Sequence, residues 1–221
     1  MVTTAPTDQQ IKTALSDARL STFEAAIGPP DPRLARALDL YAWNAQVSAA
    51  LLAPLHVCEV VVRNAVSDAL THVYGAQWPW SATFEQSLPS PPNGFNPRVE
   101  LARARNHQPS TGKVIAELKF VFWSKMFTGR FDARVWNNHL RIVFPNMDAS
   151  KSVQDLRRLI FKDLEQLREL RNRIAHHEPI FKRKLGVDFT KIQELIAFRC
   201  PTTAAWMASN QQAAALITAK P

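Results

Sequence analysis

The sequence predicts an all-α protein, and three observations indicate it. Apolar residues recur at three- and four-residue steps over long segments, as they do on the buried face of a helix. The chain contains only 6 glycines, which argues against an all-β fold with many tight turns. Apolar residues make up 46% of the 221 residues, enough for a sizeable core. We therefore expect one all-α domain over residues 1–221.

The N-terminal part predicts two short helices and then a long apolar region. Residues 8–28 look like the two short helices, with Ser21 as the N-cap of the second. The segment "PPDP", residues 29–32, interrupts the chain. The apolar pattern then continues from Leu34 to Val73. Pro54 fits the start of a helix, where its missing N–H is harmless; a kink inside a longer helix is the alternative.

Residues 75–112 are rich in proline and show little periodicity. We expect a long irregular connection there, with a short helix over residues 98–106. Loops of this length often carry function or move, so this segment is a candidate for either role.

Regular patterns return after this connection. Residues 114–127 predict one helix and residues 131–144 predict another. The turn that follows offers Asp148 or Ser150 as the cap of the next helix. These segments extend the all-α pattern into the C-terminal half of the chain.

The clearest helical pattern lies in residues 153–174, where apolar residues step by three or four throughout. This helix should end near His177, because the residue before Pro179 avoids the α region. Two shorter helices are expected over residues 190–198 and 202–217. The C-terminal part thus continues the helical pattern.

The charge favours a polyanionic partner. Lys and Arg number 27 against 19 Asp and Glu, which gives a formal net charge of +8. Ten Lys or Arg and five Asp or Glu fall between Lys151 and Lys184, so much of the excess lies there. Nucleic acid is the simplest partner for such a surface, although charge alone does not define a site.

Several features indicate a soluble, cytoplasmic protein. Cys58 and Cys200 are the only cysteines, which excludes a disulfide framework and a CxxC metal pair. The N-terminus lacks an apolar signal core. The most apolar stretch contains Pro54, His56 and Glu59, so it is a poor membrane span. We expect reduced thiols and no membrane association.

The segment "ELRNRIAHHEPIF", from Glu169 to Phe181, holds the main candidate site. Cations in the last turn of a helix complement its dipole and cap its carbonyls, which is the plain structural interpretation. The alternative is a phosphate site. Arg171 and His176 are five residues apart, about 140° around an ideal helix. A loosened last turn, or a partner subunit supplying half of the site, is needed to bring both to one phosphate.

A second candidate group lies in "EVVVRNAV". Glu59 and Arg63 are four residues apart on one helical face, and Asn64 follows, so an ordinary i,i+4 ion pair explains them. However, Glu59 interrupts a strongly apolar stretch, and charged residues are rarely buried without a partner or a task. We expect these residues to support the site on the later helix.

Other chemistries find little support in the sequence. His176, His177 and Glu178 are consecutive and cannot all face one ion from a helix, and no HExxH motif occurs. Glycine-rich phosphate loops and GxSxG are also absent. The aromatic runs "LYAWN" and "FVFW" have helical spacing and should pack into the core. We therefore expect no metal and no cofactor.

Five stretches of the sequence are informative together: "LSDARLSTFEAAIG", "ALDLYAWNAQVSAALL", "EVVVRNAV", "VIAELKFVFWSKMF" and "LRELRNRIAHHEPIF". As a set they resemble the Abi-like proteins of the HEPN superfamily, which are associated with abortive phage infection in bacteria. The stretches occur in the family's order and cover about residues 13–181, with weaker support from "TTAAWMASN". Val121 stands where the family often has glycine, a departure that we expect to affect helix packing but not the site.

The resemblance implies a HEPN-like helical bundle with extra N- and C-terminal helices. It also implies a metal-independent endoribonuclease that acts as a homodimer, with an Arg-x4–6-His motif from each subunit facing the other. Arg171, Asn172 and His176 match this motif. Arg171 would hold the phosphate, Asn172 would orient the phosphate or His176, and His176 would be the general acid/base.

His177 is the second choice for base or RNA contact, and Arg173, Glu59, Arg63 and Asn64 are further candidates for catalysis or RNA binding. The expected partner is RNA, and the sequence does not identify any antitoxin or regulatory protein. A non-catalytic HEPN module that binds RNA or a protein is the alternative. A purely structural helical dimer is the third possibility.

Overall fold

The computed structural model describes residues 7–28 and 33–221, and these residues form helices without strands. The first helices are α1 Asp8–Leu15, α2 Asp17–Ile27, α3 Arg33–Tyr74, α4 Ala82–Ser87, α5 Pro97–Arg105, α6 Thr111–Glu117 and α7 Phe120–Lys125. The later ones are α8 Asn137–Val143, α9 Val153–Ala175, α10 Leu185–Arg199, α11 Pro201–Ser209 and α12 Ala213–Thr218. The predicted all-α class is confirmed.

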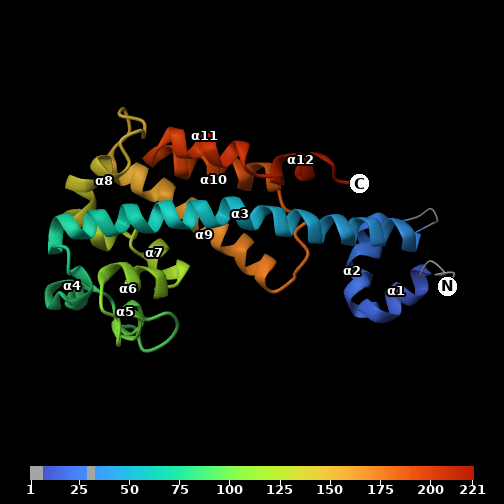
Figure 1. Cartoon of the computed structure of the whole chain (residues 1–221), viewed down its shortest axis with the longest axis horizontal. Helices are drawn as coiled ribbons and strands as arrows, with labels where there is room; N and C mark the ends of the chain where they lie inside the picture. Colours follow the sequence, from blue (N-terminus) through green and yellow to red (C-terminus); the bar gives the residue numbers. More distant parts are fainter. Residues whose placement is uncertain (1–6, 29–32) are drawn as a thin grey trace.

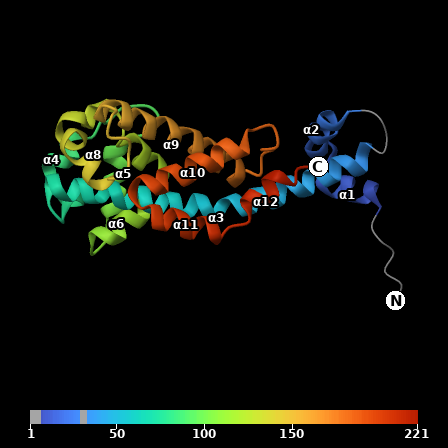
Figure 2. The ribbon, with the colours of Figure 1, turned by 90° about the horizontal axis from the view of Figure 1, so that it is seen from above.

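The molecule is elongated, because α3 runs along most of its length (Figure 1). Helices α1 and α2 lie at the N-terminal end of α3, and α4–α7 form a lobe beside its C-terminal end. Helices α10, α11 and α12 follow α3 on the other side, and α9 crosses it at an angle (Figures 1 and 2). One cluster of buried apolar residues extends from Phe23 in α2 to Ala213 in α12.

The first two helices meet at Ser16. Thr7 forms a capping box with Gln10 at the start of α1. Ser16 adopts φ 79° and its hydroxyl accepts a hydrogen bond from the amide of Arg19, so it is the N-cap of α2. The prediction that Ser21 caps the second helix is wrong, because Ser21 lies inside α2. The predicted break at residues 29–32 lies outside the described residues.

The long apolar region forms one helix of 42 residues, and Pro54 lies inside it. The prediction that Pro54 begins a helix is therefore wrong. Proline removes the hydrogen bond that the carbonyl of Ala50 would otherwise accept, which favours an end or a kink. Burial of Leu51, Pro54 and Leu55 in the core compensates for that loss.

By length and composition alone, α3 is apolar enough to cross a membrane, and 33% of its most apolar window is buried inside the molecule. Core helices of water-soluble proteins meet the same criterion. Here α3 packs against α2, α8, α9, α10 and α12. The expectation that this chain does not associate with a membrane stays a prediction.

Residues 75–112 are more ordered than the sequence predicts. They contain a 3-10 turn at Trp78–Trp80 and the helices α4 and α5, besides the start of α6. The prediction of one long irregular connection is wrong in this respect, although the short helix expected over residues 98–106 corresponds to α5. Trp78, Phe84 and Leu101 are fully buried, so tertiary packing rather than periodicity orders the segment.

The next segment is broken more often than its pattern suggests. The single helix predicted over residues 114–127 is two helices, α6 and α7, which meet at Leu118 and Lys119. The helix predicted over residues 131–144 begins with a 3-10 turn, Gly129–Phe131, and a π-helical turn, Asp132–Trp136, before α8. The aromatic runs pack into the core as predicted, since Trp43 and Trp123 are both buried.

Helix α9 agrees closely with the predicted residues 153–174. Its N-cap is Ser152, which accepts a hydrogen bond from the amide of Asp155, so neither Asp148 nor Ser150 caps it, contrary to the prediction. The helix ends at Ala175, close to the predicted end. Three helices rather than two follow, because residues 210–212 separate α11 from α12.

Candidate nucleic-acid site

The motif segment ends α9 in a Schellman turn. The amide of Glu178 donates to the carbonyl of Arg173 (2.8 Å), and the amide of His177 donates to that of Ile174 (3.0 Å). His177 has φ 55°, the left-handed conformation that this turn requires and that glycine usually provides. An ion pair between Arg173 and Glu178, 3.7 Å long, spans the turn.

The chain beyond this turn is fastened to α3. The amide of Ile180 donates to the side-chain oxygen of Asn44, a buried residue on α3, at 2.8 Å. Arg173 also donates to the carbonyl of Pro179 (3.2 Å). The two histidines therefore project from a turn that is held on both sides. Both side chains are exposed.

Arg171 contacts α3 through an ion pair. Its Nε lies 3.4 Å from Oε2 of Glu59, and the two side chains are 44% and 19% exposed. The guanidinium is thus directed by a carboxylate from another helix while much of it stays open to solvent. This arrangement leaves its remaining N–H groups available to an anion.

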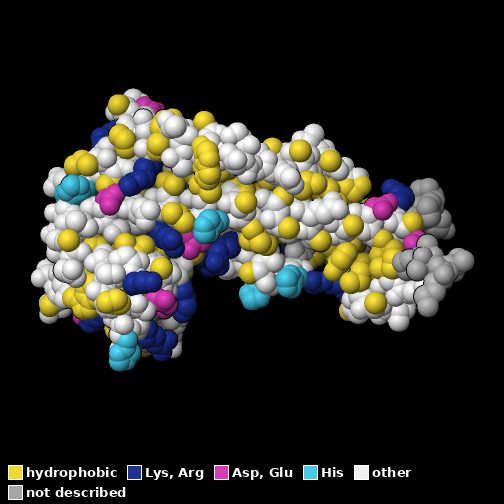
Figure 3. Space-filling view, viewed as in Figure 1, with side chains coloured by type: hydrophobic (Ala, Val, Ile, Leu, Met, Phe, Trp, Pro, Cys, Tyr) yellow, Lys and Arg dark blue, Asp and Glu magenta, His cyan; other side chains and the backbone are white. Residues whose placement is uncertain are grey.

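Arg171 and Asn172 line a cavity of about 540 Å³ between α3, α9 and the α6–α7 junction. Lys119 and Arg168 contribute two more cations, and Glu59 and Glu117 contribute two carboxylates. Cations therefore outnumber carboxylates in the lining. Figure 3 shows Lys and Arg side chains gathered along the hollow between the α4–α7 lobe and the end of α9.

The other two cations of the cavity are also oriented by carboxylates. Lys119 pairs with Glu100, a buried residue of α5, at 3.1 Å. Arg168 pairs with Glu165 at 3.2 Å. Each cation of the lining is thus held by an acidic residue, which fixes its position and offsets part of its charge.

Glu165 also ties α9 to α7. Ser124 donates to its Oε1 at 2.8 Å, and Lys125 contacts its Oε2 at 3.2 Å. Burial alone would raise the pKa of Glu165, but the hydrogen bonds from Arg168, Ser124 and Lys125 outweigh burial and lower it. The carboxylate therefore stays ionised and keeps Arg168 in place at neutral pH.

The histidines do not share the cavity of Arg171 within one chain. His177 lines a different cavity, of about 410 Å³, together with Tyr41, Leu52 and Ile174. His176 is exposed at the end of α9 and lines neither of these two cavities. One subunit thus presents Arg171 and Asn172 together, and His176 apart from them.

The residues Glu59, Arg63 and Asn64 on α3 do not form the ordinary i,i+4 ion pair that their spacing suggests. Glu59 pairs with Arg171, and no ion pair between Glu59 and Arg63 occurs among the described residues. Within the same residues, the enclosed Nε of Arg63 finds no hydrogen-bond partner. Asn64 is exposed. Of these three residues, only Glu59 lines the cavity of Arg171.

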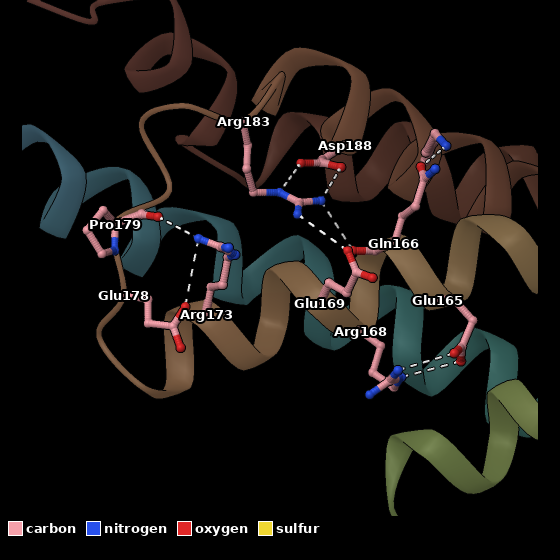
Figure 4. A network of polar contacts seen from close by, with 10 residues as sticks. Glu165, Gln166, Arg168, Glu169, Arg173, Glu178, Pro179, Arg183 and Asp188 are labelled. Carbon is pink, nitrogen blue, oxygen red and sulfur yellow. Dashed lines mark hydrogen bonds and ion pairs between the residues drawn. The ribbon is translucent and has the colours of Figure 1, made fainter. Parts of the chain in front are cut away.

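Much of the positive charge of the motif region is engaged in ion pairs. Figure 4 shows Arg183 between Asp188 and Glu169, Arg173 beside Glu178, and Arg168 beside Glu165. Arg157 is buried and holds Asp132 with two hydrogen bonds of 2.8 and 3.2 Å. The charge excess of the sequence therefore overstates the free positive charge of this face.

Sequence reasoning missed several residues of the cavity, chiefly Lys119, Arg168 and Phe95. Arg168 precedes Arg171 by three residues on α9, so helical spacing was a usable signal. Lys119 and Phe95 come from distant connections, and no local pattern marks them. Val121 also lines this cavity, so the expectation that position 121 does not touch the candidate site is wrong.

Within residues 7–28 and 33–221, no three His, Cys, Asp or Glu side chains are grouped to hold a metal ion. Cys58 is buried, which raises the pKa of its thiol to about 12 and makes it a poor nucleophile.

Comparison of the chain with family models, with curated proteins and with solved structures gives no match in any of the three.

Proposed function

We propose that this chain is a metal-independent endoribonuclease that acts as a homodimer and cleaves RNA through attack of the substrate's own 2′-OH. The observation that carries the proposal is the Glu59–Arg171 pair, which presents a half-exposed guanidinium in a cavity where cations outnumber carboxylates. Exposed His176 follows five residues later, as the C-cap of the same helix. The similarity to Abi-like HEPN proteins supports the same activity and a role in antiphage defence.

The residues suit the chemistry. A neutral imidazole accepts the proton of the 2′-OH, and an imidazolium protonates the departing 5′ oxygen. Arg171 binds the phosphate through two N–H groups and stabilises the added negative charge of the pentacoordinate state. The products are a 2′,3′-cyclic phosphate and a 5′-OH. Asn172, beside Arg171 in the same cavity, orients the phosphate.

A dimer would bring together the arginine and the histidine, which lie apart within one chain. Arg171 and Asn172 line one cavity while His176 projects from the exposed end of α9. In a two-fold dimer the same surface of each subunit meets the other. We propose that this surface is the one around the end of α9, so that His176 of one subunit faces Arg171 of its partner. The composite site then contains one group for the phosphate and one for the proton.

The test is RNA cleavage in EDTA by the wild-type protein, with analysis of the product ends. His176→Ala should lower the rate about a hundred- to ten-thousandfold, and Arg171→Ala about a hundred- to a thousandfold. Arg158→Ala is the matched control, since Arg158 is an exposed arginine of α9 that pairs with Asp155 in the first turns of the helix. Undiminished cleavage by both site variants would refute the proposal.

The second candidate is a non-catalytic module that binds RNA. One observation favours it: neither histidine lines the cavity of Arg171 within one chain. A binder would retain intact RNA, lose affinity as salt rises, and be weakened by Arg171→Ala but not by His176→Ala. Absent or salt-insensitive RNA binding would instead favour a purely structural helical dimer.

A further inference from the structure

The cavity of Arg171 has an apolar neighbour. A second cavity, of about 110 Å³, is lined by Phe95 and by other residues that are mostly apolar, among them Phe122, Met126 and Phe131, together with Lys125 and Thr128. Phe95 lines both cavities, so it borders one space with three cations in its lining and another whose lining is mostly apolar. Neither the motif nor the proposed cleavage chemistry uses this second cavity.

We propose that this pair of cavities binds one unpaired nucleotide, with the phosphate among Lys119, Arg168 and Arg171 and the base against Phe95. The inference rests on the proposed function for its ligand, since it names how the same site holds single-stranded nucleic acid. Alternation of cationic groups with an aromatic ring is the arrangement by which single strands are bound.

The sizes of the two cavities agree with this division. Sites for whole small molecules have volumes of about 300–1,000 Å³. The cationic cavity, about 540 Å³, falls in that range, while the apolar one, about 110 Å³, has room for a ring and little more. A base is flat and apolar on its faces, and a phosphate is charged, so each part of a nucleotide matches one cavity.

The loop that carries Phe95 is held in place. Asn96 donates to the hydroxyl of Ser90 (3.0 Å) and to the carbonyl of Pro91 (3.1 Å). Arg98 donates to the carbonyls of Leu88 (2.9 Å) and Gln86 (3.1 Å). A pre-organised ring loses little freedom when a base stacks on it, which favours binding.

The polar groups beside the apolar cavity are already engaged. The hydroxyl of Thr128 donates to the carbonyl of Lys125 at 2.9 Å, and the ammonium of Lys125 contacts Glu165 at 3.2 Å. Few groups are left to read the edge of a base. The site therefore accepts any base through its ring face, and oligomers of different bases should bind with similar affinities.

The experiment measures fluorescence anisotropy of a labelled oligothymidylate and of an equally long oligomer of tetrahydrofuran abasic units. Neither has a 2′-OH, so neither is cleaved, and binding is read whether or not the chain is a nuclease. The wild-type protein should bind the oligothymidylate more tightly. Phe95→Ala should weaken that binding about five- to a hundredfold and leave abasic binding unchanged.

Two further variants serve as controls, one for the loss of the aromatic ring and one for the removal of an unrelated exposed aromatic residue. Phe95 packs against the core, so Phe95→Trp, which keeps an aromatic face, should bind nearly as the wild type does. Trp206→Ala removes an aromatic residue that is 58% exposed on α11, across α3 from the α4–α7 lobe, and should change neither affinity. Thermal unfolding of each variant checks the fold.

The outcomes separate this inference from the nuclease proposal. If the wild-type protein binds the two oligomers with equal affinity, the base site is refuted. It is also refuted if Phe95→Ala weakens the binding of both oligomers equally or weakens neither. RNA cleavage combined with either result leaves the nuclease in place without a base site. Base-dependent binding that Phe95→Ala removes, without RNA cleavage, leaves the base site in place and refutes the nuclease.

Discussion

Glu59 on α3 and Arg171 on α9 lie 112 positions apart in the sequence and form an ion pair of 3.4 Å in the lining of one cavity. The arginine is 44% exposed, so the pair contributes little to stability, about 1 kcal/mol at most. Its consequence is orientation: the carboxylate aims the guanidinium while leaving it accessible.

Glu59→Gln should separate orientation from charge in RNA cleavage. The substitution removes a negative charge from the cavity, so KM should fall, and it loosens Arg171, so kcat should fall as well. Glu117→Gln is the matched control, because Glu117 lines the same cavity and has no ion pair among the described residues. It should lower KM without lowering kcat. Equal kcat values for the two variants would contradict an orienting role of Glu59.

Replacing His177 by glycine should distinguish the two histidines. His177 occupies a left-handed position, φ 55°, which is strained for a residue with a Cβ. His177→Gly should therefore stabilise the fold by about 0.5–1 kcal/mol, measured by urea unfolding. His107→Gly, at φ 59° in the α5–α6 connection, is the control for stability.

RNA cleavage should persist in the His177→Gly variant and be lost in the His176→Ala variant. The reason is that His177 lines the cavity of Tyr41 and Leu52 on its own chain, whereas exposed His176 lines neither cavity and is left to meet a partner subunit. If His177→Gly abolishes cleavage while the more stable fold is retained, then His177 carries the proton and the assignment of His176 is wrong.

Mixing two inactive variants should reveal a site shared between subunits. Arg171→Ala retains its histidines, and His176→Ala retains its arginine, so a mixed dimer has one composite site with both groups. We expect partial recovery of cleavage after the two proteins are unfolded together and refolded, and none when each is treated alone. No recovery, despite mixed dimers shown by mass spectrometry, would place Arg171 and His176 of one subunit in the same site.

The sequence predicted the elements that depend on one amphipathic pattern. Helix α9 follows apolar steps from Val153 to Ile174, and its observed end at Ala175 is close to the predicted one. Pro54 and residues 75–112 were predicted less well, because their structure depends on tertiary burial. Core contacts keep α3 continuous through Pro54, and buried Trp78 and Phe84 order the segment that follows.

The site could be predicted only where a local feature of the sequence marks its residues. Arg171 and Asn172 lie side by side in the motif, and both line the cavity. The sequence also predicted a supporting role for Glu59, which interrupts an apolar stretch and pairs with Arg171. Lys119 and Phe95 reach the same cavity from two other parts of the chain. Their proximity is a consequence of helix packing, which no local spacing encodes.

Acid should weaken the attachment of α7 to α9 through Glu165. Its pKa is lower in the folded state, since the hydrogen bonds from Arg168, Ser124 and Lys125 outweigh burial. A lowered folded-state pKa gives a stabilisation that is present above the unfolded value, about 4.3, and is lost as pH falls through the folded value.

Glu165→Gln should therefore cost more stability near neutral pH than in acid below the folded-state pKa of Glu165, where the wild-type carboxyl is also protonated. Urea unfolding at the two pH values measures the difference. Glu169→Gln is the control, because Glu169 is 65% exposed and lies 3.8 Å from Arg183. A pH-independent effect of Glu165→Gln would show that its charge does not stabilise the fold.

Arg157 should be a structural residue although it belongs to the basic helix α9. It is 8% exposed, and its guanidinium donates to Asp132 at 2.8 and 3.2 Å and to the carbonyl of Phe127 at 3.1 Å. These bonds fasten α9 to the π-helical turn that begins at Asp132. Breaking a buried pair on one side leaves the other charge without its partner.

Arg157→Ala should therefore destabilise the fold by about 3–5 kcal/mol in urea unfolding. Arg158→Ala, at the next position, removes an exposed arginine with an i,i+3 pair to Asp155 and should change stability by about 0.5 kcal/mol or less. Arg157→Lys should remain destabilised, because an ammonium cannot replace the two-pronged contact with Asp132. A loss below about 1 kcal/mol for Arg157→Ala would contradict this role and mean that Asp132 finds another partner.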